Sequence, residues 1–178
     1  MRRIFVLLTA LVVTAFCLFS CAADTVSDPF TVFYGDINAV CRVDVQGAKS
    51  EILFSRRGGA IKAEFTAPQK LAGFVLSQEG EVTYLSHGDL AVPIQESAAL
   101  ILNLCKDAFS PHYASITDIQ SEKSGGETLT VITARGFIYA FSANGTPKSI
   151  SGTHSGKQFT LQIGSISLAQ SVTESGKG

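Results

Sequence analysis

The sequence predicts a mainly β (α+β) domain in which a curved antiparallel sheet of about 10–11 strands wraps around one buried helix. Runs of alternating apolar and polar residues recur about every 8–12 residues between Gly or Pro, the pattern of an antiparallel meander with one buried face. The second observation is one long stretch without Gly or Pro, residues 98–109, which as a helix is apolar over most of its circumference. Such a helix must be buried on several sides.

The first 20 residues have the composition of a signal peptide. Arg2 and Arg3 precede an uncharged apolar run, residues 4–19, and small residues follow at 20–23. A positive start, an apolar stretch and a small-residue exit are the three parts of a secretory signal. The apolar run is slightly short of the about 20 residues that span a bilayer, so an uncleaved anchor helix is the less favoured interpretation.

The exit sequence Leu18-Phe19-Ser20-Cys21 resembles the bacterial lipobox. Leu18, Ser20 and Cys21 match that pattern, whereas Phe19 is bulkier than the residue usual there. The resemblance implies cleavage before Cys21 and a diacylglycerol, with acyl chains such as palmitate, on its sulfur. Two or more acyl chains anchor a protein stably where one does not. We therefore expect an extracytoplasmic lipoprotein attached to a bacterial membrane; cleavage near Ala22-Ala23, giving a free secreted protein, is the alternative.

The charge balance excludes some partners. The 14 basic residues include Arg2 and Arg3, so the processed chain keeps 12 basic beside 15 acidic residues, a net charge of −3. This is no basic footprint for nucleic acid and no polybasic patch for anionic lipid. Residues 21–29 predict a short lipidated tether, residues 30–170 one domain that we expect to be monomeric, and residues 171–178 a frayed tail.

Before the predicted helix the sequence indicates about six strands. Five cover residues 38–46, 51–55, 61–65, 74–77 and 82–85, and the turn 87–89 leads into the sixth. Gly47, Pro68 and Gly80 end individual runs. Arg56-Arg57-Gly58-Gly59 has the composition of a hairpin turn. Its two arginines could meet a lipid phosphate or a partner carboxylate, but a solubilising hairpin tip is the favoured interpretation.

The helix is predicted over residues 98–109, with Ser97 as its N-cap and Pro111 after its end. Its polar residues Asn103, Lys106 and Asp107 form one narrow stripe. Five more strands follow, over residues 115–119, 129–133, 137–141, 149–151 and 159–163. One of them carries three aromatic residues on one face, and the Asn-Gly pair after it is a strong hairpin signal.

This order of strands, helix and strands behind a tether resembles the outer-membrane lipoprotein-sorting proteins of the LolA/LolB type, and actinobacterial envelope lipoproteins of that shape. The closest stretch is residues 61–93, where a strand ends at Pro68, the next carries residues 74–77, Glu79-Gly80 turns and residues 82–85 precede Pro93. The resemblance implies an open half-barrel with a helix lid around a hydrophobic cavity. That cavity would hold acyl chains or an acylated partner. Because the soluble carrier of that family has no anchor, Cys21 favours a membrane-bound acceptor or resident binder.

In such a half-barrel the inward side chains would line the cavity. The candidates are Val43, Phe54, Ile61, Phe65, Phe74, Tyr84, Leu100, Ile101, Leu104, Val131, Phe137, Tyr139, Phe141, Phe159 and Leu161. An ordinary packed core without a ligand would contain the same set, and that interpretation stays open. So does an envelope scaffold module that recruits a partner through an exposed apolar patch.

The sequence predicts no enzyme, no catalytic residue, no metal and no cofactor. His87, His112 and His154 lie in or beside turns without metal-ligand spacing. A nucleophile elbow and a phosphate-binding loop are missing from the sequence. An unrecognised hydrolase stays open, and it would need His112 or His154 beside a carboxylate and a hydroxyl. Cys41 and Cys105 could form a disulfide outside the cytoplasm or remain two buried thiols.

Overall fold

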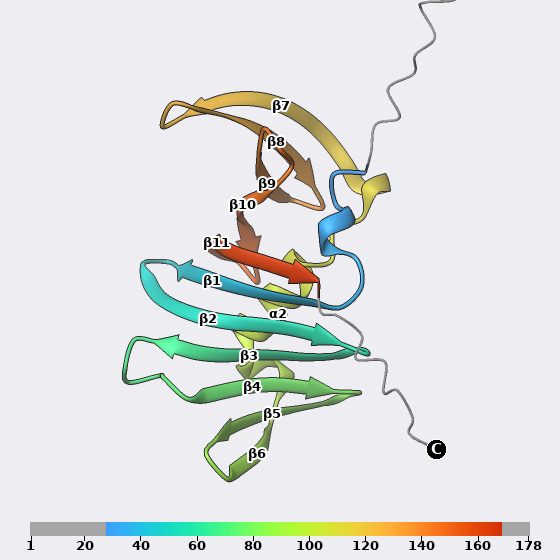
Figure 1. The fold of residues 1–178 in the computed structure, drawn as a ribbon. Coiled ribbons are helices and arrows are strands. Elements are labelled where there is room, and N and C mark those ends of the chain that lie inside the picture. The colour runs from blue at the N-terminus through green and yellow to red at the C-terminus, as the bar shows by residue number, and fades with distance from the viewer. Residues whose placement is uncertain (1–27, 169–178) are drawn as a thin grey trace, which may run out of the picture.

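The structure is a computed structural model that describes residues 28–168. Eleven antiparallel strands form one open sheet in the order β6-β5-β4-β3-β2-β1-β11-β10-β9-β8-β7 (Figure 1). The chain starts in the middle of the sheet, runs outward to β6, crosses through a helix to the opposite edge and returns inward to β11 beside β1. The mainly β class and the number of strands are as predicted, and β6 and β7 leave the sheet unclosed.

The strands coincide with the predicted runs and extend most of them. Their bounds are β1 Ile37–Val45, β2 Ala48–Arg57, β3 Ala60–Ala67, β4 Phe74–Glu79, β5 Val82–His87, β6 Leu90–Ile94, β7 Ile116–Ser124, β8 Glu127–Ala134, β9 Phe137–Ser142, β10 Pro147–His154 and β11 Lys157–Leu168. Three 3₁₀ turns complete the described chain: η1 Thr31–Phe33, η2 Glu96–Ala98 and η3 Tyr113–Ser115.

The helix α2, Leu100–Ala108, begins later than predicted. Ser97 lies inside η2 and is not the N-cap, which is Ala99 and receives no side-chain hydrogen bond. The Asn103 side chain instead donates to the Glu96 carbonyl at 2.8 Å. This hydrogen bond joins the start of η2 to the first turn of α2. The prediction of a Ser97 cap is therefore wrong, because a 3₁₀ turn precedes the helix.

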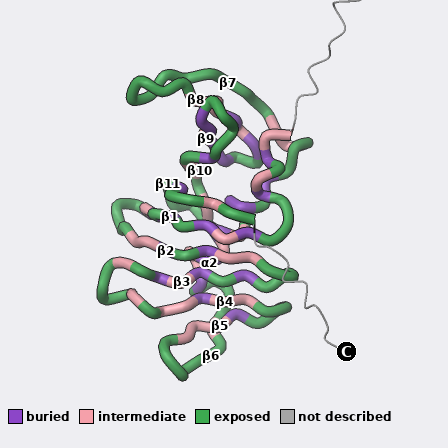
Figure 2. The backbone as a smooth tube through the Cα atoms, in the orientation of Figure 1, coloured by how far each residue is buried: buried purple, intermediate pink, exposed green. Residues whose placement is uncertain are grey.

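The helix lies against the middle of the sheet (Figure 1). Leu102, Leu104, Cys105 and Ala108 are buried there. The predicted wrapping of the sheet around one buried helix is not confirmed, since the sheet stays open and two further apolar residues of the helix are half-buried. Figure 2 shows the same division, with burial concentrated on the central strands and exposure along β6 and β7.

One extra residue in β11 adjusts which side chains face the core. Val40 pairs with Ser165 but Cys41 pairs with Ile163, so Gly164 is a bulge between the two pairs. Without a bulge, alternation would place Ser165 on the core side after Ile163. The bulge shifts the phase by one, and Ile166 packs against the core instead.

Candidate functional site

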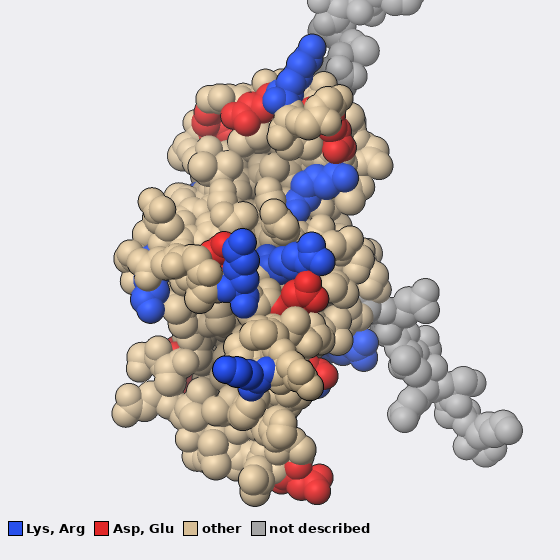
Figure 3. Space-filling view, turned by 90° about the vertical axis from the view of Figure 1, so that its left-hand side faces the viewer, with Lys and Arg blue, Asp and Glu red and all other residues tan. Residues whose placement is uncertain are grey.

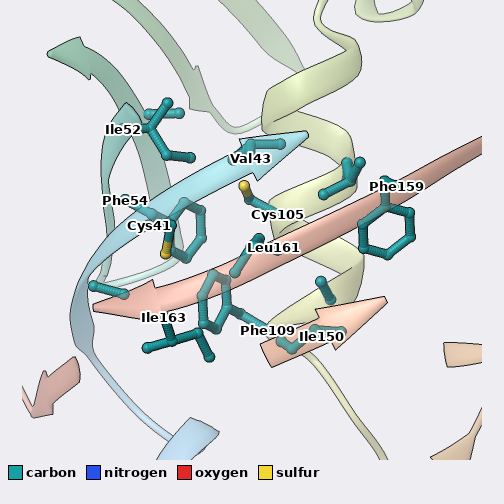
Figure 4. Packing of buried hydrophobic residues seen from close by; sticks show 14 of the residues in the cluster. Cys41, Val43, Ile52, Phe54, Cys105, Phe109, Ile150, Phe159, Leu161 and Ile163 are labelled. Atoms are coloured by element: carbon teal, nitrogen blue, oxygen red, sulfur yellow. The ribbon is translucent and has the colours of Figure 1, made fainter. Parts of the chain in front are cut away.

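The inner face of the sheet, defined as the face that α2 covers, carries most of the predicted cavity residues. Ten of the fifteen are at most 9% exposed: Val43, Phe54, Ile61, Phe65, Leu104, Phe137, Tyr139, Phe141, Phe159 and Leu161. Figure 4 shows the central part of this set between β1, β11, β10 and the helix. Phe54 stacks on Phe109 with ring centroids 4.9 Å apart. The middle of the inner face is therefore filled by the chain's own side chains.

The segment before β1 fills the inner face over β9. Phe30 and Phe33 are 0% and 1% exposed. The Phe30 ring meets Tyr139 edge-on at 5.0 Å between centroids, and the Phe33 ring lies 6.1 Å from Phe141. Neither residue was among the predicted cavity residues, because both lie before the first predicted strand. The Phe-x-x-Phe spacing after Pro29 was the available signal, as it places two rings on one side of a single turn.

Arg56 holds this segment in place. It lies within β2, not at a hairpin tip, and its Nε donates to the Gly35 carbonyl at 3.0 Å. Its Nη2 donates to the Phe33 carbonyl and its Nη1 to the Phe109 carbonyl at 3.0 Å. Burial lowers the pKa of Arg56, against an opposing effect of the Asp36 charge. The favoured solubilising role is therefore wrong for Arg56, which joins η1 to the end of α2.

The inner face is only partly covered at its β4–β6 end. There Phe74, Leu85 and Ile94 are half-buried, while Val92 and Leu90 are 52% and 77% exposed. We call these five residues the β4–β6 patch. Leu85 pairs with Val92, and His87 pairs with both Phe74 and Leu90, so the five side chains share one face. The ring centroids of Phe74 and His87 lie 4.6 Å apart.

Two predicted cavity residues lie on the opposite, outer face. Tyr84 and Val131 are half-buried, whereas their neighbours Thr83 and Ile132 are 3% and 1% exposed and face the core. Their assignment to the inner face is wrong, because a shift of one residue in phase moves every side chain of a strand to the other face. The remaining candidates, Leu100 and Ile101 on the helix, are half-buried and pack against the core.

The outer face carries a hollow at its centre with several charged residues in its lining. A hollow of about 620 Å³ lies across β1, β2 and β11, and Arg42, Lys49, Glu51 and Gln162 contribute to its lining. Arg42 donates to Glu51 at 2.8 Å; the Arg42 side chain is largely exposed and that of Glu51 is half-buried. Figure 3, which faces the β1–β2 and β3–β4 hairpins, shows charges of both signs interspersed. The lining of this hollow also includes the apolar residues Val43, Ala67 and Pro68.

The two cysteines of the domain, Cys41 and Cys105, are buried and unbridged. Burial raises the pKa of Cys41 to about 12 and that of Cys105 well above its ordinary value. Thiols of this kind are neutral at physiological pH and behave as small apolar side chains. The structure therefore corresponds to the alternative of two buried thiols.

Within residues 28–168, the histidines and hydroxyls do not assemble into a catalytic set. His154 Nδ1 lies 3.4 Å from an Asp107 carboxylate oxygen, but within residues 28–168 no hydroxyl is hydrogen-bonded to this imidazole. His112 Nδ1 accepts the Ala114 N–H in a local turn. The Tyr139 hydroxyl is buried without a hydrogen-bond partner in the described chain, and burial raises its pKa. Residues 28–168 also contain no group of three or more His, Cys, Asp or Glu side chains that could hold a metal ion.

The export segment with Cys21 and the tail after residue 168 lie outside the described residues. Within the described part, no helix has the length and apolarity to cross a membrane.

Comparison with known proteins finds likeness only in structure. No protein-family model matches the sequence, and no curated protein matches it either. Among solved structures, an outer membrane lipoprotein-sorting protein domain from Vibrio parahaemolyticus is similar at 11% identity and a TM-score of 0.41, over 79% of this chain and 88% of that one.

Two further solved structures match in the same way. The lipoprotein LppX of Mycobacterium tuberculosis has 12% identity and a TM-score of 0.46, over 76% of this chain and 89% of that one. A LolA superfamily protein from Nitrosomonas europaea has 11% identity and a TM-score of 0.37, over 76% and 86%. The solved structures similar to this chain thus include a LolA superfamily protein and a lipoprotein-sorting domain, the family that the resemblance in strand order indicated. All three TM-scores are below 0.5.

Proposed function

We propose that this chain is a non-enzymatic, lipid-anchored envelope lipoprotein that binds an acyl chain, free or on an acylated partner, on the inner face of its half-barrel. The observation that carries the proposal is the β4–β6 patch. Its five side chains are aligned on one face, at an end of the sheet that the helix leaves open. Apolar surface that stays in water favours an apolar partner, since each buried CH₂ contributes about 0.8 kcal/mol.

The rest of the inner face is a poorer location for the ligand. Phe30 and Phe33 cover the face over β9, and Phe109 stacks on Phe54 in the middle. An acyl chain there would have to displace packed aromatic rings. At the β4–β6 patch it would only add apolar contacts to Leu90 and Val92, which are already exposed. The proposed site therefore needs no rearrangement of the core.

Binding is tested by native mass spectrometry and displacement of a fluorescent fatty acid, with residues 22–178 and three variants. Val92→Thr and Leu90→Ser make the β4–β6 patch polar, and each is expected to weaken probe binding at least about fivefold, the loss of roughly 1 kcal/mol of apolar contact. Val40→Thr on the outer face is the matched control, since Val40 is 47% exposed. Unchanged affinity in both patch variants, or an equal loss in Val40→Thr, would contradict this site.

The anchor has its own test. Incorporation of labelled palmitate in a bacterial host is expected for the wild-type chain and for Cys17→Ser, and is expected to be lost in Cys21→Ser. Label retained in Cys21→Ser, or missing from all three proteins, would rule out the proposed anchor.

A scaffold module is the second candidate, and one observation favours it. Val40 and Leu53 pair across β1 and β2 on the outer face and are 47% and 39% exposed. In this candidate a protein partner covers that pair and the domain carries no lipid. A clean apo mass with no probe displacement, together with partner binding that Val40→Thr abolishes, would replace the acyl-chain proposal.

A further inference from the structure

Two exposed tyrosines lie where the described chain begins. Tyr34 and Tyr113 are 43% and 48% exposed. The Tyr34 hydroxyl donates to the Asp28 carboxylate at 2.5 Å, and the backbone of Tyr113 lies beside that hydroxyl. The Asp28 carboxylate also accepts the Phe30 N–H at 2.9 Å. Asp28 is thereby fixed beside Tyr34, next to the backbone of Tyr113.

The Tyr34 phenol stays neutral under physiological conditions. Its hydrogen bond to Asp28, with burial and the negative charge of that carboxylate, raises the pKa of Tyr34 to about 12. A neutral phenol is an apolar ring with one polar atom. Tyrosines of this kind are enriched at the boundary between lipid and water.

The chain between the proposed anchor and this cluster is short. Cys21 and Asp28 are separated by seven peptide steps, which reach at most about 25 Å when fully extended. A lipid on Cys21 therefore keeps the end of the domain that carries Asp28 close to the bilayer. In Figure 1 this end, with η1 and η3, is opposite the β1–β2 hairpin.

We propose that the surface formed by Tyr34 and Tyr113 faces and contacts the membrane, with both phenol rings at the lipid headgroup level. The proposal rests on the lipid anchor under the proposed function, but not on acyl-chain binding. It sets the orientation of the domain: η1 and η3 face the bilayer, and the β1–β2 hairpin points away from it.

The absence of tryptophan from the sequence makes a direct test available. The variants Tyr34→Trp and Tyr113→Trp each introduce a single fluorophore that keeps an interfacial aromatic side chain. Ala48→Trp, at an exposed position of the β1–β2 hairpin, is the matched control. The full lipidated proteins are placed in nanodiscs with lipids brominated near the headgroup. We expect quenching at positions 34 and 113 to be at least about twice that at position 48.

The outcomes separate the two proposals. Equal quenching at all three positions, or quenching at position 48 alone, would overturn the membrane-facing surface. An unmodified Cys21 mass, with protein that fails to join the nanodiscs, would overturn it together with the anchor. Val92→Thr in the Tyr34→Trp background is expected to leave quenching unchanged. If acyl-chain binding fails while this quenching pattern holds, the orientation stands and only the ligand is wrong.

Discussion

At the scale of single residues, Arg56 shows how one side chain connects distant segments. Its guanidinium donates to the carbonyls of Phe33, Gly35 and Phe109, groups that come from before β1 and from the end of α2. A lysine has one point charge in place of this planar fork of donors. The position therefore requires arginine for geometry as well as for charge.

We expect Arg56→Gln to lower the free energy of unfolding by about 2–4 kcal/mol, since charge-assisted hydrogen bonds are lost, two of them to partly buried carbonyls. Arg57→Gln, at the exposed neighbouring position, should change it by less than about 0.5 kcal/mol. Urea unfolding measures both. Equal effects of the two substitutions would show that Arg56 acts only through net charge.

Tyr139 gives the opposite expectation, because its hydroxyl is buried without a partner in the described chain. An unsatisfied buried polar group costs about 1–3 kcal/mol. Tyr139→Phe should therefore leave the free energy of unfolding unchanged or raise it by about 1 kcal/mol. Tyr139→Ala should lower it by about 3–5 kcal/mol, because the ring packs on Phe30. Clear destabilisation by Tyr139→Phe in thermal unfolding would mean that the hydroxyl has a partner in solution.

At the scale of elements, the contact between β9, β10 and β11 depends on a missing side chain. Gly152 pairs with Phe137 on one side and with Phe159 on the other. The two rings meet edge to face above it, with centroids 5.4 Å apart. A Cβ at position 152 would lie 2.9 Å from the Phe137 ring and 3.0 Å from the Gly136 carbonyl, at a φ of +156°.

Gly152→Ala should therefore lower the free energy of unfolding by about 1–3 kcal/mol, the usual range for overpacking. Ser151→Ala, the adjacent residue on the other face, is the control and should change it by less than about 1 kcal/mol. Chemical denaturation of the two variants side by side tests this. If Gly152→Ala left the free energy of unfolding unchanged, β9 and β10 would be able to move apart at position 152 at no cost in stability.

At the scale of the whole molecule, one core spans the sheet from β4 to β8. The helix packs on the central strands, and η1 covers β9 while Arg56 of β2 holds η1. The β1–β6 half and the β7–β11 half of the sheet are thus connected through elements that lie on its inner face. Such connections favour unfolding as a single unit.

We expect denaturant unfolding followed by far-ultraviolet circular dichroism and by tyrosine fluorescence to give one coincident transition. The first signal reports on all eleven strands and the second includes Tyr139 in the β9 region. Two separated midpoints would show that the β7–β10 end unfolds independently of the rest.

Much of this architecture followed from local patterns. Alternation and turn residues located the strands, and the apolar stretch before Pro111 located the helix. Both signals depend on residues close in sequence, so neither needs the tertiary structure. The proposed signal peptide and Cys21 belong to the same category, since they are also read from neighbouring residues.

Only the tertiary structure decided where these elements place their side chains. It put Tyr84 and Val131 on the outer face and turned Arg56 inward to three backbone carbonyls. In the folded chain Phe30 and Phe33 also pack on the inner face over β9, where the sequence predicted part of a ligand cavity. The β4–β6 patch is then the more exposed part of the inner face. The sequence by itself determined the strands, the helix and their order, because these depend on local periodicity and turn chemistry. The phase of a strand and the partner of a buried group depend on contacts between segments far apart in the chain, which alternation alone does not specify.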